Sequence, residues 1–124
     1  MRDHTPTIER YIACWNETDA ERRRVIINET WTESASYVDP LMQGSGHEGI
    51  NAMIDAVQKQ FPGFRFSLTK KVDSLNDSVR FAWGLAPQEG PALAEGTDFG
   101  IIAPDGRIET ITGFLDRVPD PANA

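Results

Sequence analysis

Residues 34–50 read SASYVDPLMQGSGHEGI, a stretch in which a short strand ends and a helix begins. Proline cannot continue a central strand, so the strand is predicted to end at Asp39 and Pro40. Tyr37 shares a strand face with Asp39, and a carboxylate on an apolar face is costly unless it is paired or used. Asp39 is therefore either a solvated turn residue or a carboxylate that points into a pocket.

Helical periodicity lies on both sides of this strand. The first helix has an apolar stripe with helical spacing, formed by Ile8, Tyr11, Ile12 and Trp15. A second helix is predicted over residues 19–31, where Thr18 and Glu21 fit a capping box. After the strand and a glycine-rich loop, apolar residues between positions 50 and 61 predict a third helix, which Pro62 and Gly63 end.

The rest of the chain has the alternating pattern of strands, at residues 64–72, 78–85, 92–102 and 107–118. Asn76-Asp77 and Pro104-Asp105-Gly106 supply turns. Helices gathered on one side of an antiparallel sheet define the α+β class. We therefore expect one domain over residues 1–124, in which three N-terminal helices pack on a curved, mainly antiparallel sheet and leave a cone-shaped hollow for a ligand.

The composition narrows the choice of partners. The 124 residues include 19 acids and 12 bases, and the net charge of −7 argues against a nucleic-acid partner. Cys14 is the single cysteine, and the two histidines have no ligand-like spacing with acids, so neither a disulfide nor a metal site is expected. No apolar run is long enough to span a membrane, and the first residues lack a signal-peptide core. These features predict a soluble cytoplasmic protein.

Three local patterns resemble one superfamily. They are ERYIACWNETD at residues 9–19, ASYVDP at residues 35–40 followed by GHEGI, and GTDFGIIAPDGRIETITGFLD at residues 96–116. Together they resemble the nuclear transport factor 2-like superfamily, whose members include ketosteroid isomerases and SnoaL-like polyketide cyclases. The resemblance runs from about Ile8 to Val118 and implies a cone-shaped α+β fold. It is weakly specific for activity, because this fold carries enzymes, binding modules and structural subunits.

Within the superfamily, three positions resemble the catalytic residues of ketosteroid isomerases. The resemblance implies that Asp39 is the general base, which moves a proton next to a ketone. It also implies that Tyr11 and a neutral Asp98 donate hydrogen bonds to the developing oxyanion. Such an enzyme needs no cofactor. Asp98 could donate only if it stays protonated, which requires an apolar site with little water.

Further residues are expected to contact a small hydrophobic ligand. These candidates are Trp15, Tyr37, His47, Phe66, Trp83 and Phe114. Phe99 is a poorer candidate for a wall residue, because strict strand alternation sends it to the face opposite Asp98. Ordinary explanations compete with these roles. Tyr11 and Trp15 lie on an apolar helix stripe and fit core packing equally well, and His47 fits a polar residue at a helix start.

Other functions stay open at this stage. A non-catalytic binding module would use the same hollow without Asp39 chemistry. A hydrolase or dehydratase would need Asp39 to hold a water with Tyr37 or His47. An assembly subunit would show a filled core and an apolar sheet face. Members of this superfamily often pair through the sheet, so a homodimer is expected.

Overall fold

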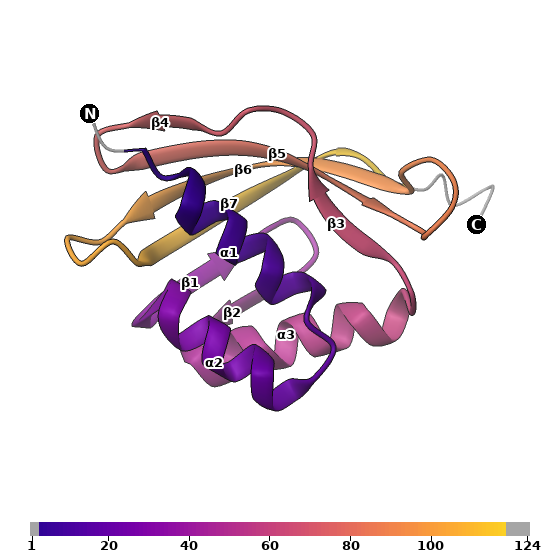
Figure 1. The fold of residues 1–124 in the computed structure, drawn as a ribbon, viewed down its shortest axis with the longest axis horizontal. Helices are drawn as coiled ribbons and strands as arrows, with labels where there is room; N and C mark the ends of the chain where they lie inside the picture. The colour runs from indigo at the N-terminus through magenta and orange to yellow at the C-terminus, as the bar shows by residue number, and fades with distance from the viewer. Residues whose placement is uncertain (1–2, 119–124) are drawn as a thin grey trace.

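The computed structural model describes residues 3–118 and places three helices against one side of a curved sheet (Figure 1). The helices are α1 (Thr5–Asn16), α2 (Ala20–Thr30) and α3 (Gly46–Gln60). The strands are β1 (Trp31–Val38), β2 (Gln43–Ser45), β3 (Arg65–Leu68), β4 (Asp73–Leu75), β5 (Ser78–Ala86), β6 (Ala94–Ile102) and β7 (Ile108–Arg117). The predicted α+β class with three N-terminal helices is confirmed. No helix between residues 3 and 118 is long and apolar enough to cross a membrane.

The sheet has seven strands, with the order β2-β1-β7-β6-β5-β3 and with β4 paired to β5. Strand β1 runs parallel to β7, and every other pair is antiparallel. The long strands β5, β6 and β7 arch over the helices in Figure 1, and β1 and β2 continue the sheet behind α2. The parallel pair brings the end of β1 beside the middle of β7, because Val38 lies opposite Thr112.

Two predicted elements differ from the structure. The predicted glycine-rich loop contains β2, which pairs with the end of β1. The strand predicted at residues 64–72 is divided, because its register with β5 changes by two residues between Leu68 and Asp73. Lys70 and Lys71 bulge from the sheet at this point, as extra residues in one strand of a pair do. Alternating polar and apolar letters do not reveal such an insertion.

The ends of the elements follow local chemistry. Asp19, rather than Thr18, caps α2, and its carboxylate accepts from the backbone N–H groups of Glu21 and Arg22. The predicted turn at Asn76-Asp77 is confirmed, and Asn76 takes a φ of 54° there. The turn at residues 104–106 is also confirmed, with Gly106 at a φ of 89°.

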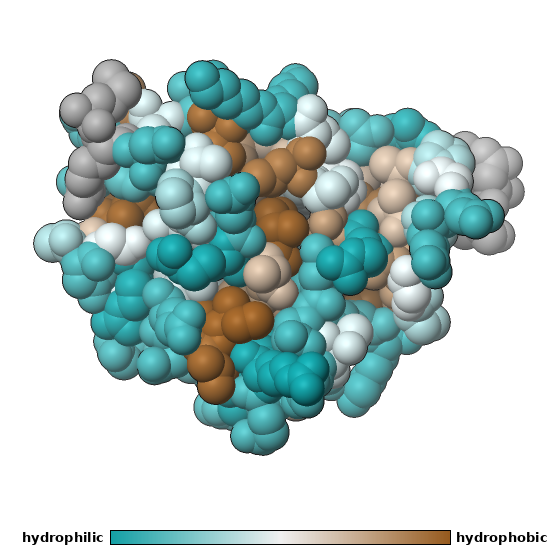
Figure 2. Space-filling model, viewed as in Figure 1, coloured by the Kyte–Doolittle hydropathy of each residue, from teal (hydrophilic) through white to brown (hydrophobic). Residues whose placement is uncertain are grey.

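The core lies between the helices and the concave face of the sheet. Its fully buried side chains include Ile8, Ile27, Trp31, Ile54, Phe81 and Ile111. The helical side of the surface is mostly hydrophilic, with apolar side chains gathered near its centre (Figure 2). Val25 of α2 is 59% exposed. The buried apolar side chains form one continuous core, as expected for a domain of this size.

Polar side chains join the helices to each other. Arg23 of α2 has no exposed surface, and its guanidinium donates to side chains of Asn51, Asp55 and Gln58 on α3 and to the Glu17 carbonyl. These bonds, at 2.6 to 3.1 Å, compensate for burial of the charge. A planar group with five fixed donors suits this set of acceptors better than lysine would.

Asn16, the last residue of α1, fixes that helix to the sheet. Its side-chain amide donates to the Phe66 carbonyl at 2.9 Å and accepts from the Phe66 N–H at 2.8 Å. The side chain thus takes the place of a neighbouring strand beside β3. This contact gives a structural reason for the asparagine in the ERYIACWNETD pattern, and it places Trp15 directly against the inner face.

The buried guanidinium gives a test of the helical layer. Arg23→Ala should lower the free energy of unfolding by about 3 kcal/mol or more, because several buried acceptors lose their donor. Arg22→Ala is a matched control, since the Arg22 side chain is 76% exposed on the same helix. It should change stability by less than about 0.5 kcal/mol. Urea unfolding followed by tryptophan fluorescence measures both, and equal losses would contradict a structural role for Arg23.

Candidate functional site

Asp98 lies at the centre of the concave face. Alternation along β6 turns it inward, and only 1% of it is exposed. Its Oδ2 accepts from the Tyr11 hydroxyl of α1 at 2.8 Å, and its Oδ1 accepts from the Trp83 indole N–H of β5 at 2.9 Å. Both carboxylate oxygens are therefore engaged by side chains that belong to other elements.

Burial sets the protonation of this group. Burial raises the pKa of Asp98 to about 6. The hydrogen bonds from Trp83 and Tyr11 lower this pKa, whereas the charges of Asp39 and Asp116 raise it further. Burial also raises the pKa of Tyr11, and the neighbouring Asp98 charge raises it further. Asp98 is thus a carboxyl group that changes charge within one or two pH units of neutrality.

Asp39 is held differently, immediately after β1. Its Oδ1 accepts the backbone N–H groups of Leu41 at 2.7 Å and Met42 at 2.9 Å. Its Oδ2 accepts the Tyr37 hydroxyl at 2.6 Å. Asp39 is therefore a turn residue, and its role in a pocket stays a prediction. One oxygen caps the turn at Pro40, and the other turns toward the concave face, where the residue is half-buried.

Gly113 of β7 joins the two carboxylates. A Cβ atom built on this residue would lie 2.9 Å from Asp98 Oδ1, 3.2 Å from Asp39 Cβ and 3.3 Å from the Tyr37 hydroxyl oxygen. Asp98 is also the cross-strand partner of Gly113. Asp39, Asp98 and Tyr37 thus meet at one glycine, and Tyr11 joins this group through its hydrogen bond to Asp98. Alternation along β7 from the buried Ile111 places Gly113 on the inner face.

Aromatic rings enclose this group. The Trp15 ring lies between those of Tyr11 and Tyr37, with centroids 6.3 and 5.7 Å away. Phe66 packs against both Trp15 and Trp83, at 5.2 and 5.4 Å. Four of the six predicted ligand contacts therefore surround the carboxylates: Trp15, Tyr37, Phe66 and Trp83.

The other two candidates lie elsewhere. Phe114 follows the inward Gly113, so alternation turns it to the outer face, where it is 57% exposed. The expectation that Phe114 lines the hollow is wrong for this reason. His47 bonds the Trp31 carbonyl at 2.9 Å, at the start of β1, whereas Asp39 follows the end of that strand. A dyad of His47 and Asp39 does not form. Among residues 3–118, no three potential metal ligands of the His, Cys, Asp or Glu type come together.

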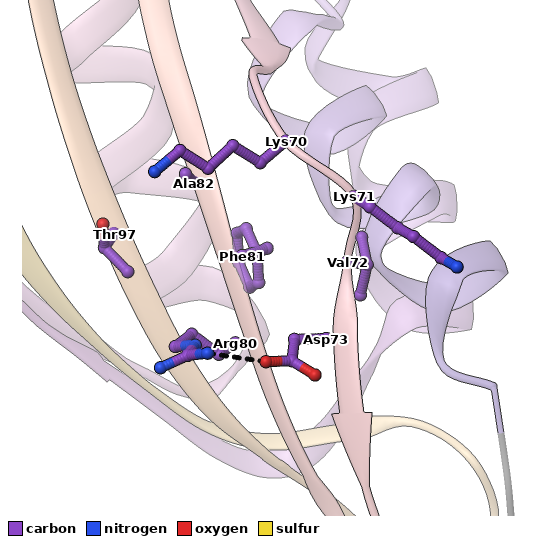
Figure 3. Close-up of a pocket in the computed structure, with 8 residues that line it drawn as sticks. All are labelled: Lys70, Lys71, Val72, Asp73, Arg80, Phe81, Ala82 and Thr97. Atoms are coloured by element: carbon purple, nitrogen blue, oxygen red, sulfur yellow. Dashed lines mark hydrogen bonds and ion pairs between the residues drawn. The ribbon is translucent and has the colours of Figure 1, made fainter.

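A pocket of about 580 Å³ lies on the convex face of the sheet, beside the bulge. Figure 3 shows Lys70 reaching over Ala82 toward Thr97, and an ion pair of 2.6 Å between Arg80 and Asp73. Arg80, Ala82 and Thr97 alternate with the inward residues of their strands. This pocket is therefore separated from the two carboxylates by the sheet itself, and it is not the predicted hollow.

The sequence profile of the SnoaL-like domain family matches residues 8–111, which is most of the chain. The chain belongs to the SnoaL-like domain family. The resemblance to the nuclear transport factor 2-like superfamily is thereby confirmed. None of the curated proteins compared with the chain matches it.

Solved structures show the same fold. One from Agrobacterium tumefaciens strain C58, provisionally named an isomerase of the SnoaL-like family, has a TM-score of 0.88 and 45% identity over 92% of this chain and 97% of that one. A SnoaL-like protein from Jannaschia sp. CCS1, provisionally named a polyketide cyclase, has a TM-score of 0.67 and 19% identity over 94% of this chain and 92% of that one. A nuclear transport factor 2-like protein of unknown function from Cytophaga hutchinsonii gives 0.68 and 11%, over 94% and 92%. The last two likenesses show the fold alone.

Titration of Asp98 should appear in the stability of this SnoaL-like protein. Because its folded pKa of about 6 is above the unfolded value of 3.8, the folded state holds an extra proton between these values. Stability from this group is present below about pH 4 and is lost as the pH rises through about 6. Relative to Asp98→Asn, the wild type should therefore lose up to about 3 kcal/mol between pH 4 and pH 7. Urea unfolding of both proteins across this range measures the difference, and a constant difference would contradict a raised pKa.

Proposed function

We propose that this SnoaL-like protein is a cofactor-free acid–base enzyme that acts on a small hydrophobic carbonyl compound, as a ketosteroid isomerase-like isomerase or a SnoaL-like cyclase. One observation carries the proposal: Asp39 and Asp98 flank Gly113, and each accepts a hydrogen bond from a tyrosine. Two carboxylates in unlike surroundings can divide the roles of base and acid. The chain acts in this proposal as one domain, with a cytoplasmic location that its single cysteine supports.

Asp39 is the general base in this proposal. An ionised carboxylate has about four lone-pair sites, and three donors occupy three of them. The remaining site is on Oδ2, beside Tyr37, and it can accept a proton from a carbon next to a carbonyl group. The two backbone N–H groups stabilise the negative charge of Asp39 without depending on any other side chain. Asp39 would return the same proton further along the conjugated intermediate.

The apolar surroundings favour charge stabilisation by fixed donors. Phe66, Trp15 and Trp83 exclude water from the Asp98 side of Gly113, so hydrogen bonds there act in a low dielectric. Donors that are already aimed at a developing oxyanion stabilise it without reorganisation. The half-buried Asp39 leaves that side of the site closer to solvent, where a ligand would enter.

The similar structures support a carbonyl substrate only in part. The 45%-identical Agrobacterium protein bears a provisional isomerase name, and the more distant Jannaschia protein bears a cyclase name. Isomerisation of the ketosteroid type begins with a proton taken from carbon, which is the step that Asp39 would perform.

A water-activating enzyme is the second candidate, and the short bond between Tyr37 and Asp39 favours it. A hydroxyl at 2.6 Å from Oδ2 could position a water beside the base. The His47 variant of this hypothesis has no support, because that ring is bound at the other end of β1. A non-catalytic binding module would retain ligand binding after loss of Asp39 and would turn over no ketone.

Asp39→Asn tests the isomerase proposal. Wild type should convert a β,γ-unsaturated steroid ketone to its conjugated isomer, with a rise in ultraviolet absorbance. The substitution should lower kcat by roughly 10²- to 10⁴-fold, because asparagine cannot accept the proton. Asp73→Asn is the control, since Asp73 pairs with Arg80 on the convex face and should leave the rate within about twofold.

The outcomes separate the candidate functions. No turnover by wild type would sink the isomerase proposal. Ketone binding that persists in Asp39→Asn without any turnover would favour a binding module. Hydration or hydrolysis products that depend on both Asp39 and Tyr37 would favour the water-activating enzyme.

The convex face supports a homodimer. Val38, Phe99 and Phe114 are apolar and exposed there, on the neighbouring strands β1, β6 and β7. Exposed apolar side chains on one face of a sheet are a usual site for symmetric pairing.

Phe114→Lys should shift the protein from dimer to monomer at micromolar concentration, because a buried lysine without a partner opposes association. Val25→Lys is the control, since Val25 is equally exposed on the helical side. Sedimentation equilibrium measures both variants. A wild type that is already monomeric would contradict the dimer.

A further inference from the structure

The hydrogen bonds of Asp98 restrict where its proton can lie. Trp83 faces Oδ1 with an indole N–H, which can only donate. Tyr11 faces Oδ2 with a hydroxyl, which can donate or accept. When Asp98 is protonated, its proton therefore belongs on Oδ2 and points to the Tyr11 oxygen. The Tyr11 hydroxyl proton is then released from Asp98 and can turn to another acceptor.

A second donor lies next to that hydroxyl. The Trp15 indole N–H is buried, with 4% of the residue exposed, and it has no hydrogen-bond partner within residues 3–118. The centroid of the Trp15 ring lies 6.3 Å from that of the Tyr11 ring. Burial raises the pKa of Tyr11, and the Trp15 N–H is among the groups that lower it. A buried N–H without an acceptor is uncommon and costly. A ligand oxygen beside Tyr11 would satisfy it.

Trp31 offers a comparison with Trp15. Its N–H also has no acceptor among the described residues, and its ring lies 5.6 Å from Tyr11. The Trp31 residue has no exposed surface, and its N–H is among the groups that lower the pKa of the Cys14 thiol, which burial raises to about 12. Trp31 thus packs in the hydrophobic core, whereas the Trp15 ring packs against Tyr37 and Phe66 on the side of Asp39.

We propose that the Trp15 N–H and the Tyr11 hydroxyl form the donor pair that binds an oxygen acceptor of the ligand, a carbonyl or enolate-like oxygen, while Asp98 stands behind Tyr11 as a positioning residue. This inference rests on the proposed carbonyl chemistry at the same site. It differs from the arrangement that the resemblance implies, in which Asp98 itself donates to the oxyanion. Both Asp98 oxygens already have partners, whereas the Trp15 N–H has none within residues 3–118.

The groups around Asp98 define its pH behaviour. Tyr11 faces it from α1, Trp83 from β5, Tyr37 from β1 and Asp39 from the turn after β1, while Asp116 of β7 acts by charge. Ionised Asp98 retains the Tyr11 proton, so ligand affinity should fall as the pH rises through the titration of Asp98. Asp98→Asn should remove this fall, because its amide can donate to the Tyr11 oxygen and accept from Trp83 at every pH.

Three tryptophans make the donor directly visible. A nitrogen-15 spectrum of wild type should show three indole N–H signals, assigned with single Trp→Phe variants. We expect addition of a conjugated steroid enone, or of cyclohex-2-enone at millimolar concentration, to move the Trp15 signal and leave the Trp31 signal in place. Trp15→Phe should weaken enone binding by about 5- to 10-fold, and Trp31→Phe by less than twofold.

The result also separates this inference from the proposed function. Turnover that needs Asp39, with an unmoved Trp15 signal and unchanged affinity in Trp15→Phe, would overturn the donor pair alone. A moved Trp15 signal without turnover would support the donor pair and remove the enzyme. If neither enone shifts the Trp15 signal at saturating concentration, the inference is overturned. An enone affinity of wild type that does not change between pH 5 and pH 8 would overturn the part assigned to Asp98.

Discussion

The buried Asp98 carboxylate is the interaction on which the arrangement of the site depends. Water cannot solvate it, so the protein must supply donors, and it takes them from α1 and β5. The Tyr11 bond fixes the position of α1 across the sheet, and the packing of the Tyr11 ring on Trp31 and Phe81 follows. An apolar pair of similar volume would hold a helix on a sheet at lower cost. The carboxyl group is therefore better explained by chemistry than by stability.

Two glycines make room for this arrangement. Gly113 has no side chain, so Asp39 and Asp98 can both lie close to the position that a Cβ atom on this residue would take. Gly96 of β6 does the same for Trp83, because a Cβ there would lie 2.6 Å from the indole Cε2. The Trp83 ring can reach Asp98 only because it lies over this glycine. The strands that shape the concave face thus also set the geometry of its polar groups, and small residues are required at both positions.

Much of the fold could be predicted from the sequence, because periodicity and turn residues are local signals. The helices, the Asn76-Asp77 turn and the inward direction of Asp98 with Phe99 outward all follow from spacing. The split at Lys70 and Lys71 could not be predicted, since a bulge changes register without changing the pattern of polar and apolar residues. The prediction for Phe114 was wrong because Gly113 carries no side chain that marks the inner face of β7. Phe114 is seen to face outward only once Gly113 is known to face inward.

The site was predictable only through a resemblance, and the structure adds what residue types cannot give. Three residues far apart in sequence meet because β1 pairs with β7 in parallel and α1 crosses the sheet. Spacing within one element carries no information on such a meeting. The sequence also could not predict that the Trp15 N–H lacks a hydrogen-bond partner within residues 3–118. A tryptophan on an apolar helix stripe gives the same sequence pattern with or without such a partner.

The two carboxylates are not interchangeable, and their donors explain why. Asp39 is held by backbone N–H groups, which cannot turn away, so its charge is stabilised in one fixed geometry. Asp98 is held by side chains, one of which can reverse its hydrogen bond. Asp39 and Asp98 also lie beside a single glycine. The proposed chemistry therefore requires a substrate whose acidic C–H lies within a few bonds of an acceptor oxygen, as in ketones and enones.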